Sequence, residues 1–390
     1  MRFSAYNSCM QEKVLKIDLQ KLRENALTYK RLTDRFLYAV VKADGYGHGG
    51  VAVASSLYPV ADGFAVALVR EGIAIRTAAC GKEILVLTPP LTEDDVVVAA
   101  RNGLTLTAGD ICSAQLIAET VEKYRLRICA QVKINTGMNR YGTYGATLGK
   151  VCKILKGAGQ VCVQGVYSHL YSQDRELCEM QRMRFCRDLK IVRGYFPLAR
   201  AHLAATYGVG LGETYYFDAV RIGLGLYGYS PVSRLSGGGL DEVSAEGRLR
   251  RGGSGKVSAK GRLSNKVCSW TMPRGIQPVM KAYAPCLATR ICRFGGAGYG
   301  GDRVDLQGEA LSVLRSGYAD GLGVSGENCG LRLNVPSGIC MDVCLAKGKR
   351  KRGEYALLFD DAAAVARARG TSVYEILCLA GMRAQKIYYG

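Results

Sequence analysis

The sequence predicts an α/β protein in which a parallel (β/α)8 barrel is followed by a smaller, mainly β domain. Short apolar runs of strand length recur through the first part of the chain, and segments with 3.6-residue periodicity, such as Ser113–Tyr124 and Thr147–Lys156, separate them. From Pro278 onward, strand-like runs with turns replace this helical spacing. Eight strands that alternate with helices are typical of a closed parallel barrel.

The expected barrel strands are apolar runs bounded by turn or helix signals. In chain order they are Phe36–Lys42, Gly63–Ala67, Ile84–Leu87, Leu104–Thr107, Ile128–Ile134, Val161–Ser168, Ala201–Ala204 and Val220–Tyr227. Active sites of such barrels lie at the carboxyl ends of the strands. Lys42, Lys133, His169 and Thr206 lie at or beside such ends, whereas Arg221 lies near the start of its run. The barrel therefore predicts one site that contains most of these side chains.

The rest of the chain divides into a linking segment and the second domain. The barrel is expected over residues 14–231 and the mainly β domain over residues 278–390. The elements expected in the second domain are strands at Cys286–Phe294, Ala310–Leu314, Leu331–Val335 and Ala356–Phe359, and a helix near Val373–Ala380. Between the domains lies Val232–Gln277, 46 residues with 9 Gly, 7 Ser and a net charge of +6 (9 Lys/Arg against 3 Asp/Glu). This composition is typical of a mobile linker, with a basic docking arm as the alternative.

Composition excludes several classes of protein. With 390 residues, 48% apolar and 22% charged, the chain resembles an ordinary globular protein of two domains. No apolar run is long enough to span a bilayer, and Met1 to Lys13 lacks the apolar core of a secretory signal, so a cytoplasmic location without membrane contact is expected. Fifteen cysteines without a CxxC pair, together with three histidines, predict reduced thiols and no metal site. The net charge of +20 is spread along the chain without a nucleic-acid motif, so no nucleic-acid partner is expected.

A lysine ends the first expected barrel strand and is followed by a glycine-rich turn. The segment reads Val40-Val41-Lys42-Ala43-Asp44-Gly45-Tyr46-Gly47-His48-Gly49. Apolar surroundings disfavour the charged form of a lysine and lower its pKa, and a neutral amine is what Schiff-base chemistry requires. The glycines let backbone approach a ligand closely, and a nearby helix start favours an anion. The alternative is that Lys42 only extends into solvent from the end of a strand.

This segment resembles the pyridoxal-phosphate lysine motif of the alanine racemase family, and further matches follow in order along almost the whole chain. The resemblance implies that Lys42 binds pyridoxal 5′-phosphate (PLP) covalently and that Tyr46 contacts its phosphate. It also implies that residues 1–13 join the second domain, with a candidate strand at Val14–Ile17. The family crosses Val232–Gln277 with a much shorter link, which indicates an insertion there.

A second motif, Lys133-Ile134-Asn135-Thr136-Gly137-Met138-Asn139-Arg140, puts a lysine and an arginine near the end of the fifth strand. An arginine can bind a carboxylate through two parallel hydrogen bonds. In the resembling enzymes this arginine steers the substrate carboxylate, and the matching lysine is often carbamylated, so that it becomes an anion beside the arginine. These roles would fall to Arg140 and Lys133. The alternatives are a helix-cap salt bridge for Arg140 and a surface position for Lys133.

Further barrel residues complete the expected cofactor site. By resemblance, His169 hydrogen-bonds Arg221 below the cofactor ring, although a lone histidine is also an ordinary core residue. Because an arginine remains protonated, Arg221 would leave the pyridine nitrogen unprotonated and so favour quick reprotonation of the substrate over transamination. Gly223 and Leu224 would offer backbone N–H groups to the phosphate. Thr206 stands where the family has a phosphate-binding serine.

The second domain carries four more matches. Gly296–Gly301 fits GxGxxG, but no helical pattern follows it, which argues against a dinucleotide site. The resemblance instead identifies Tyr299 as a second catalytic base, presented across a homodimer to the partner's active site. It assigns Tyr318 to the active-site entrance, Met341 to a backbone contact with the substrate carboxylate, and Tyr374 to the phosphate.

These matches predict a PLP-dependent racemase that interconverts L- and D-alanine, with Lys42 and Tyr299 as bases on opposite faces of the substrate. Such an enzyme would supply D-alanine for peptidoglycan. A serine racemase of the same fold is the nearest alternative, and Tyr374 argues for alanine because a smaller residue there would leave room for a hydroxymethyl group. A non-catalytic PLP-binding protein is a further alternative. The chain departs from the family in the segment Ala384-Gln385-Lys386, where the family commonly has an arginine.

Overall fold

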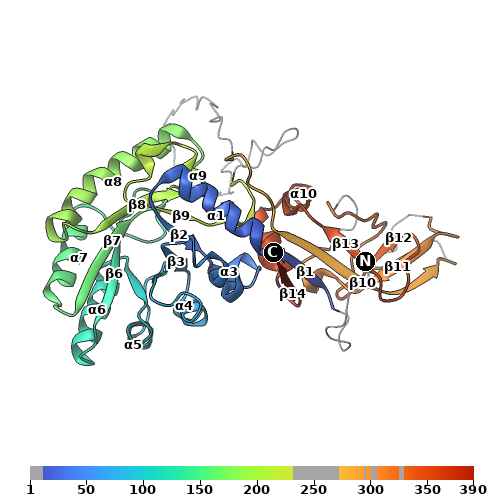
Figure 1. Ribbon diagram of the computed structural model, residues 1–390, viewed down its shortest axis with the longest axis horizontal. Coiled ribbons are helices and arrows are strands. Elements are labelled where there is room, and N and C mark those ends of the chain that lie inside the picture. Colours follow the sequence, from blue (N-terminus) through green and yellow to red (C-terminus); the bar gives the residue numbers. More distant parts are fainter. Residues whose placement is uncertain (1–11, 232–271, 294–295, 300–304, 325–328) are drawn as a thin grey trace, which may run out of the picture.

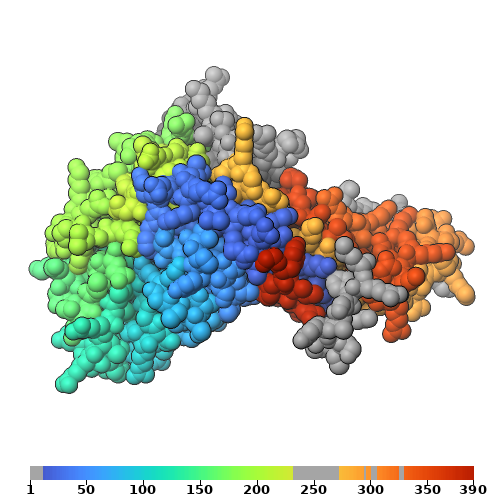
Figure 2. Space-filling model, viewed as in Figure 1, coloured from blue at the N-terminus to red at the C-terminus, as the bar shows by residue number. Residues whose placement is uncertain are grey.

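The computed structural model describes residues 12–231, 272–293, 296–299, 305–324 and 329–390. It confirms the expected architecture, a closed eight-stranded TIM barrel with a separate mainly β domain (Figure 1). The two domains lie side by side and give the molecule an elongated outline, with the barrel blue to yellow-green and the second domain orange to red (Figure 2). None of the helices in the described part of the chain combines the length and apolar character that a bilayer span requires.

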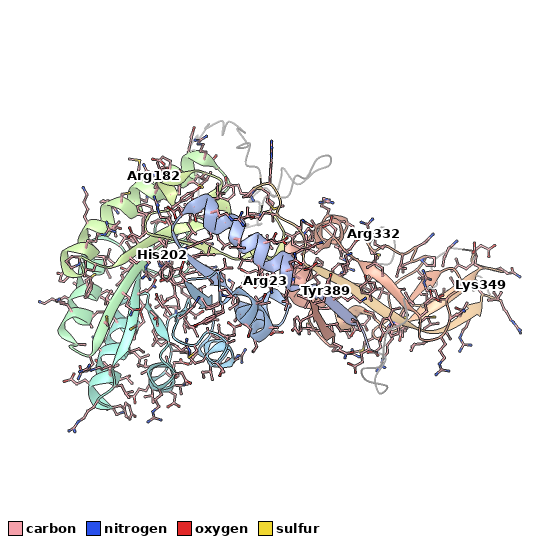
Figure 3. All side chains as sticks on the ribbon, viewed as in Figure 1. Arg23, Arg182, His202, Arg332, Lys349 and Tyr389 are labelled. Carbon is pink, nitrogen blue, oxygen red and sulfur yellow. The ribbon has the colours of Figure 1, made fainter. Side chains whose placement is uncertain are left out.

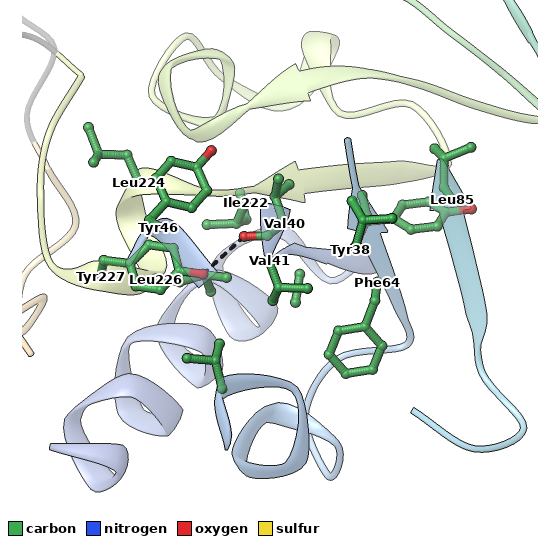
Figure 4. Close-up of a cluster of buried hydrophobic side chains, with 14 of the residues drawn as sticks. Tyr38, Val40, Val41, Tyr46, Phe64, Leu85, Ile222, Leu224, Leu226 and Tyr227 are labelled. Carbon is green, nitrogen blue, oxygen red and sulfur yellow. Dashed lines mark hydrogen bonds between the residues drawn. The ribbon is translucent and has the colours of Figure 1, made fainter. Parts of the chain in front are cut away.

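Eight parallel strands close the barrel in chain order. They are β2(Phe36–Val40), β3(Gly63–Val66), β4(Glu83–Val86), β5(Thr105–Ala108), β6(Ile128–Lys133), β7(Val161–Tyr167), β8(Arg200–Ala205) and β9(Ala219–Ile222). The strands read as continuous apolar runs because side chains on both of their faces are buried. Figure 4 shows this packing around Val40, whose carbonyl accepts a hydrogen bond from the hydroxyl of Tyr227 at 3.2 Å.

Helices and short turns connect the barrel strands, and the longer helices cover the outside of the barrel. They are α1(Leu19–Thr33), which precedes the first barrel strand, and α2(Lys42–Tyr46), α3(Gly50–Leu57), α4(Val69–Ile75), α5(Glu93–Arg101), α6(Ile111–Lys123), α7(Gly145–Gly157), α8(Arg175–Tyr195) and α9(Thr206–Val209), with a 3-10 turn η1(Glu213–Tyr215). Several begin at side-chain caps that satisfy otherwise free backbone donors. The side chains of Thr92, Asp110 and Asp174 accept hydrogen bonds from Asp95, Ser113 and Leu177, respectively.

The last barrel strand is shorter than expected. The apolar run Val220–Tyr227 is a strand only to Ile222 and continues as the 3-10 helix η2(Leu224–Tyr227). The backbone turns at Gly223, and the residues beyond it stay buried in a helical conformation, which an apolar run alone cannot distinguish from a strand. Arg221 is therefore the penultimate residue of its strand. The expectation that it lies near the start was wrong, and it joins the other candidates at the carboxyl ends.

The second domain is built on one six-stranded sheet in the order β12-β11-β10-β1-β14, with β13 also paired to β10. Its elements are β1(Val14–Asp18), β10(Met280–Ile291), β11(Ala310–Leu314), β12(Cys344–Lys347), β13(Tyr355–Phe359) and β14(Gln385–Tyr389), a 3-10 turn η3(Tyr318–Asp320), and the helices α10(Ala362–Ala368) and α11(Val373–Ala380). Strand β1 lies between β10 and β14, so the first described strand of the chain belongs to this sheet rather than to the barrel. The expected linker lies outside the described residues except for residues 272–277.

Three details of the second domain differ from expectation. The run Leu331–Val335 is not a strand; it makes isolated backbone contacts, such as that from Arg332 to Leu358 at 2.7 Å, and Pro336 directly after it has no N–H to extend a ladder. β12 pairs with β11 instead. β14 at the end of the chain was not expected either, and β10 begins six residues before the expected Cys286.

The second domain packs against the turn that follows β2. Gly47 lies so close to α11 that an added Cβ would come within 2.3 Å of the carbonyl oxygen of Leu377. Lys386 of β14 forms an ion pair of 3.0 Å with Asp44. The carboxyl-terminal elements of the chain therefore support the loop that begins at Lys42.

We expect Gly47→Ala to destabilise the protein far more than Gly81→Ala. Both glycines have positive φ, +78° and +74°, but no atom lies within 4 Å of a Cβ built on Gly81. Gly81→Ala should cost only the left-handed conformation, about 1–2 kcal/mol, whereas Gly47→Ala should add about 1–3 kcal/mol of overpacking against α11. Urea unfolding monitored by circular dichroism measures both losses. Equal losses would contradict close packing between α11 and the turn.

Candidate functional site

A cavity of about 540 Å³ opens at the carboxyl ends of the barrel strands. It is lined by ten residues that the sequence indicated as site residues: Lys42, Tyr46, Lys133, Arg140, His169, Thr206, Arg221, Gly223, Leu224 and Tyr374. Nine of them come from the barrel, and Tyr374 comes from α11 of the second domain. The structure therefore brings residues spread over more than 330 positions of sequence (374 − 42 = 332) into one pocket.

The turn after Lys42 has an unusual backbone. Ala43, Asp44 and Tyr46 have φ values of 53°, 53° and 54°, so with Gly45 between them they form a left-handed turn. This conformation costs a non-glycine residue about 1–2 kcal/mol, so surrounding contacts must hold it. Glu71 accepts the N–H of Ala43 at 2.8 Å with one carboxylate oxygen, and with the other it accepts two N–H groups at the start of α4. Asp44 accepts the N–H of Gly50 at 2.7 Å.

Lys42 directly precedes this turn and is half-buried. Burial lowers the pKa of its amine, and the charge of Arg140 lowers it further, against a smaller raising effect of Glu71 and Cys378. Lowering the pKa of an amine increases its neutral, nucleophilic fraction at a given pH. Lys42 is therefore suited to condense with a carbonyl group.

A cradle for an anion lies beside Lys42. The hydroxyl of Thr206 accepts the N–H groups of Gly223 at 3.3 Å and Gly225 at 3.2 Å, which holds the turn after β9 against the start of α9. A Cβ at Gly223 would lie 2.6 Å from the hydroxyl oxygen of Tyr46, so only glycine leaves room for that phenol. Burial raises the pKa of Tyr46, which keeps it a neutral donor. Its ring centroid lies 5.8 Å from that of Tyr374.

Arg221 lines the pocket, and its side chain is almost fully buried, with 3% of the residue exposed. Its guanidinium donates to the carbonyls of Ser168 at 2.6 Å, His202 at 3.1 Å and Leu203 at 3.2 Å, and no described carboxylate pairs with it. Two imidazole nitrogens also face it: Nδ1 of His202 at 2.6 Å and Nδ1 of His169 at 3.4 Å. Burial lowers the pKa of Arg221 to about 10, so the group remains a cation at neutral pH.

His202 was not expected at the site. It is fully buried, and burial, followed by the charge of Arg221, keeps its pKa well below the usual range. The same two causes lower the pKa of His169. The sequence did carry a signal for His202, because Arg200, His202 and Ala204 alternate along β8 and therefore share one face of the strand.

Lys133 and Arg140 occupy another wall of the pocket. Lys133 is 5% exposed, and its ammonium lies 4.6 Å from the ring centroid of Tyr167, with no ion pair to a described carboxylate. Burial, then the charges of Arg221 and Arg140, lowers the pKa of Lys133 well below the usual range. It is therefore not a surface lysine. Arg140 is exposed at the pocket, with its guanidinium carbon 5.6 Å from the ring of Tyr141.

Three predicted residues form a second group, outside this pocket. Tyr299, Tyr318 and Met341 are 70%, 40% and 52% exposed. The N–H of Tyr318 donates to Cys340 at 3.0 Å, and that of Ala319 donates to Met341 at 3.0 Å. A Cβ built on Gly338 would lie 3.4 Å from the carbonyl oxygen of Tyr299. The backbone at Tyr318 is therefore held against that at Met341, and Tyr299 lies beside Gly338, three residues before Met341.

The described residues contain no group of three or more His, Cys, Asp or Glu arranged to hold a metal ion. The pocket itself combines an amine of lowered pKa, an anion cradle and two arginines. This set of groups matches an anionic cofactor with a carbonyl group, together with a substrate that carries a carboxylate.

Comparison with known proteins agrees with this chemistry. The model of the alanine racemase amino-terminal domain matches residues 17–231, and that of the carboxyl-terminal domain matches residues 279–388. A catabolic alanine racemase from Mesorhizobium japonicum is 30% identical over 402 residues, covering 97% of this chain and 93% of the relative. An alanine racemase from Prochlorococcus marinus is 33% identical over 226 residues, and the match covers 55% of this chain and 58% of the relative.

A solved structure has the same fold. The alanine racemase from Bartonella henselae with covalently bound pyridoxal phosphate superposes with a TM-score of 0.77 at 22% identity, over 97% of this chain and 99% of the other. Both domain models match in order and together span most of the sequence. This chain belongs to the alanine racemase family of isomerases.

Proposed function

We propose that this protein is an alanine racemase that interconverts L- and D-alanine with PLP bound at Lys42. The observation that carries the proposal is the single pocket in which a lysine of lowered pKa stands beside an anion cradle and a buried arginine. The family is PLP-dependent, and the proposed product, D-alanine, would serve peptidoglycan synthesis. Lys42 would hold the cofactor covalently, and Tyr46, Thr206, Gly223 and Leu224 would bind its phosphate.

PLP supplies an electron-withdrawing system that makes the α-proton of a bound amino acid acidic. The residues of this chain would then decide where the proton goes. Lys42 would take and return the proton on one face of the substrate, since its lowered pKa gives it a neutral form that can act as a base. Arg140, exposed at the pocket, would bind the substrate carboxylate.

Arg221 would select the type of reaction. Carbonyl and imidazole acceptors hold its N–H groups. Its pKa of about 10 keeps the guanidinium protonated near neutral pH, so it does not give a proton to the cofactor. A ring nitrogen facing this guanidinium would stay unprotonated, and the cofactor would withdraw electrons less strongly. That setting favours rapid return of the proton to the same carbon over side reactions such as transamination.

We propose that Lys133 is carbamylated and orients Arg140. A buried lysine without an anion is costly as a cation, and its lowered pKa favours the neutral amine that reacts with carbon dioxide. Carbamylation would replace a neutral amine next to Arg221 and Arg140 by an anion. The modified side chain could then accept hydrogen bonds from Arg140.

The second base would come from another copy of the chain. One chain brings Lys42 and the cradle together but leaves Tyr299, Tyr318 and Met341 exposed on the second domain. We therefore propose a homodimer in which Tyr299 of one subunit faces Lys42 of the other across the substrate. Tyr318 would lie at the entrance, and Met341 would contact the substrate carboxylate through its backbone.

Chiral analysis of alanine and serine after incubation with the purified, PLP-loaded protein tests the proposed activity. Tyr374 lines the pocket and limits the room beside the substrate, so L-alanine should racemise faster than L-serine. Serine racemised faster than alanine would support the serine racemase alternative. Bound PLP without turnover of either amino acid would support a non-catalytic protein.

Borohydride reduction of the PLP-loaded protein should fix the label on Lys42. The reason is that Lys42 is the accessible pocket lysine, whereas Lys133 is buried against Tyr167. Peptide mapping by mass spectrometry locates the label, and Lys42→Ala should lose nearly all racemisation because the anchor and one base disappear together. Lys133→Met is the matched control and should keep the label on Lys42. A label on Lys133 alone would refute the assignment.

Mixing two inactive variants, Lys42→Ala and Tyr299→Phe, should restore activity. In a mixed dimer, one of the two sites would contain both an intact Lys42 and an intact Tyr299. With random exchange, half of the dimers would be mixed and half of their sites intact, so about a quarter of the wild-type rate is expected. Native mass spectrometry verifies subunit exchange. No recovered activity in verified mixed dimers would exclude a base shared across the interface.

Arg221→Glu should slow racemisation and increase the fraction of turnovers that end in transamination. A carboxylate at this position would stabilise a protonated ring nitrogen, which strengthens electron withdrawal and lengthens the time before the proton returns. The loss of rate should be about 100-fold or more, equivalent to roughly 3 kcal/mol. The measurements are chiral analysis for racemisation and pyruvate release for transamination, at equal PLP content. Arg221→Lys keeps the cation and should add no pyruvate; equal pyruvate from both variants would argue for a purely structural arginine.

A further inference from the structure

A chain of buried hydrogen bonds leads from Arg221 through the barrel interior to its opposite end. Nδ1 of His202 accepts from Arg221 at 2.6 Å, and Nε2 of His202 lies 2.6 Å from the amide oxygen of Gln131. The amide nitrogen of Gln131 donates to Glu83 at 2.7 Å and to the hydroxyl of Tyr38 at 2.9 Å. Figure 3 shows His202 among the barrel strands.

The far end of this chain is an ion pair. Arg200 donates to a carboxylate oxygen of Glu83 at 3.0 Å and to the hydroxyl of Tyr38 at 2.8 Å, and Tyr38 donates to the same carboxylate at 2.8 Å. Glu83 and Arg200 are the first residues of β4 and β8. The ion pair therefore lies at the amino-terminal end of the barrel, and Gln131 and His202 connect it to the pocket at the carboxyl-terminal end.

The donors and acceptors permit one arrangement. A carboxylate only accepts hydrogen bonds, so Glu83 requires the NH2 group of Gln131 and leaves the amide oxygen facing His202. An amide oxygen also only accepts, so Nε2 of His202 must carry a proton. Arg221 only donates, so Nδ1 of His202 must be bare. His202 is therefore neutral, with its single proton on Nε2.

The surroundings are shaped for this arrangement. Gln131 and His202 are both fully buried. A Cβ at Gly165 would come within 2.8 Å of the amide carbon of Gln131, so a glycine on the neighbouring strand makes room for the amide. The imidazole of His202 lies between the rings of Tyr38 and Tyr167, each with a centroid 5.1 Å away. The ring thus has little freedom to turn.

We propose that Glu83 and Gln131 are positioning residues that set the tautomer of His202 and, through it, the placement of the Arg221 guanidinium. The negative charge of Glu83 orients the amide, the amide orients the imidazole proton, and the bare Nδ1 holds Arg221. The consequence for catalysis rests on the proposed function, in which Arg221 selects the reaction. The tautomer itself does not, because it is a property of the protein alone.

Nitrogen-15 NMR of protein labelled on histidine tests this proposal. The chain has three histidines, and the signals of His202 are assigned by their loss in His202→Gln. In the wild type, Nε2 should be protonated and Nδ1 bare. In Glu83→Gln the amide of Gln131 is free to turn its NH2 group toward His202, so a form protonated on Nδ1 should appear. Racemisation should fall about 10-fold or more. A loss of this size is usual when a residue that orients a functional histidine through a hydrogen bond is removed.

Exchanging the two side chains provides the rescue. In Glu83→Gln/Gln131→Glu, either carboxylate oxygen of residue 131 can accept from Nε2 of His202, so the single tautomer should return, with most of the activity. Tyr38→Phe keeps the bond between Glu83 and Gln131 and should leave the tautomer unchanged. Asp62→Asn is the control. Asp62 forms a partly exposed ion pair with Lys30 and also accepts the backbone N–H of Leu37, but it shares no hydrogen bond with the side chains that link Glu83 to Arg221.

The outcomes separate the alternatives. Unchanged wild-type signals in Glu83→Gln would overturn the proposal, because Arg221 alone would then set the tautomer. If Glu83→Gln does not fold, the His202 signals of the exchanged variant are compared with those of Gln131→Leu. One tautomer in the exchanged variant and two in Gln131→Leu would support the proposal. Identical His202 signals in the two variants would refute it. An altered tautomer in a protein that racemises no amino acid would leave this inference standing and refute only the proposed function.

Discussion

A buried cation with no counter-ion among the described residues imposes the main electrostatic constraint on this barrel. Transfer of a charged group out of water costs several kcal/mol even after the protein relaxes. Arg221 meets this cost with carbonyl oxygens and two imidazole nitrogens rather than with a described carboxylate. Every titratable neighbour must then avoid a second positive charge, which is why burial and Arg221 together lower the pKa values of His169, His202 and Lys133.

A second constraint is local and concerns the backbone around Lys42. Three non-glycine residues in the left-handed region cannot hold themselves there, and the supports come from both domains: Glu71 from the barrel, and Lys386 and the backbone of α11 from the second domain. The ion pair between Lys386 and Asp44 ties the last described strand to this turn. Distant parts of the sequence thus determine the direction in which one amine points.

Strand ends in the alternating β/α pattern pointed to Lys42, Lys133, His169 and Thr206, and the family resemblance supplied the other predicted residues that line the pocket. Sequence reasoning failed where one signal has two structural meanings. The apolar run after Val220 is partly a 3-10 helix, which misplaced Arg221 relative to its strand. Leu331–Val335 has strand-like composition but lacks a ladder. The hydrogen bonds of His202 and Gln131 were missed because they become visible when the donors and acceptors of six residues from five strands are seen together.

The position of β1 has a consequence for how the chain reaches this structure. β1 pairs with β10 on one side and with β14 on the other, and its Val14 lies opposite Gln385. Such pairing has a very high contact order, because almost the entire polypeptide separates the two partners. During synthesis, β1 therefore has no partner strand until β10 and β14 have been made, long after the barrel sequence that separates them. An unpaired strand edge is a template for pairing with another chain, so this interval exposes the protein to aggregation.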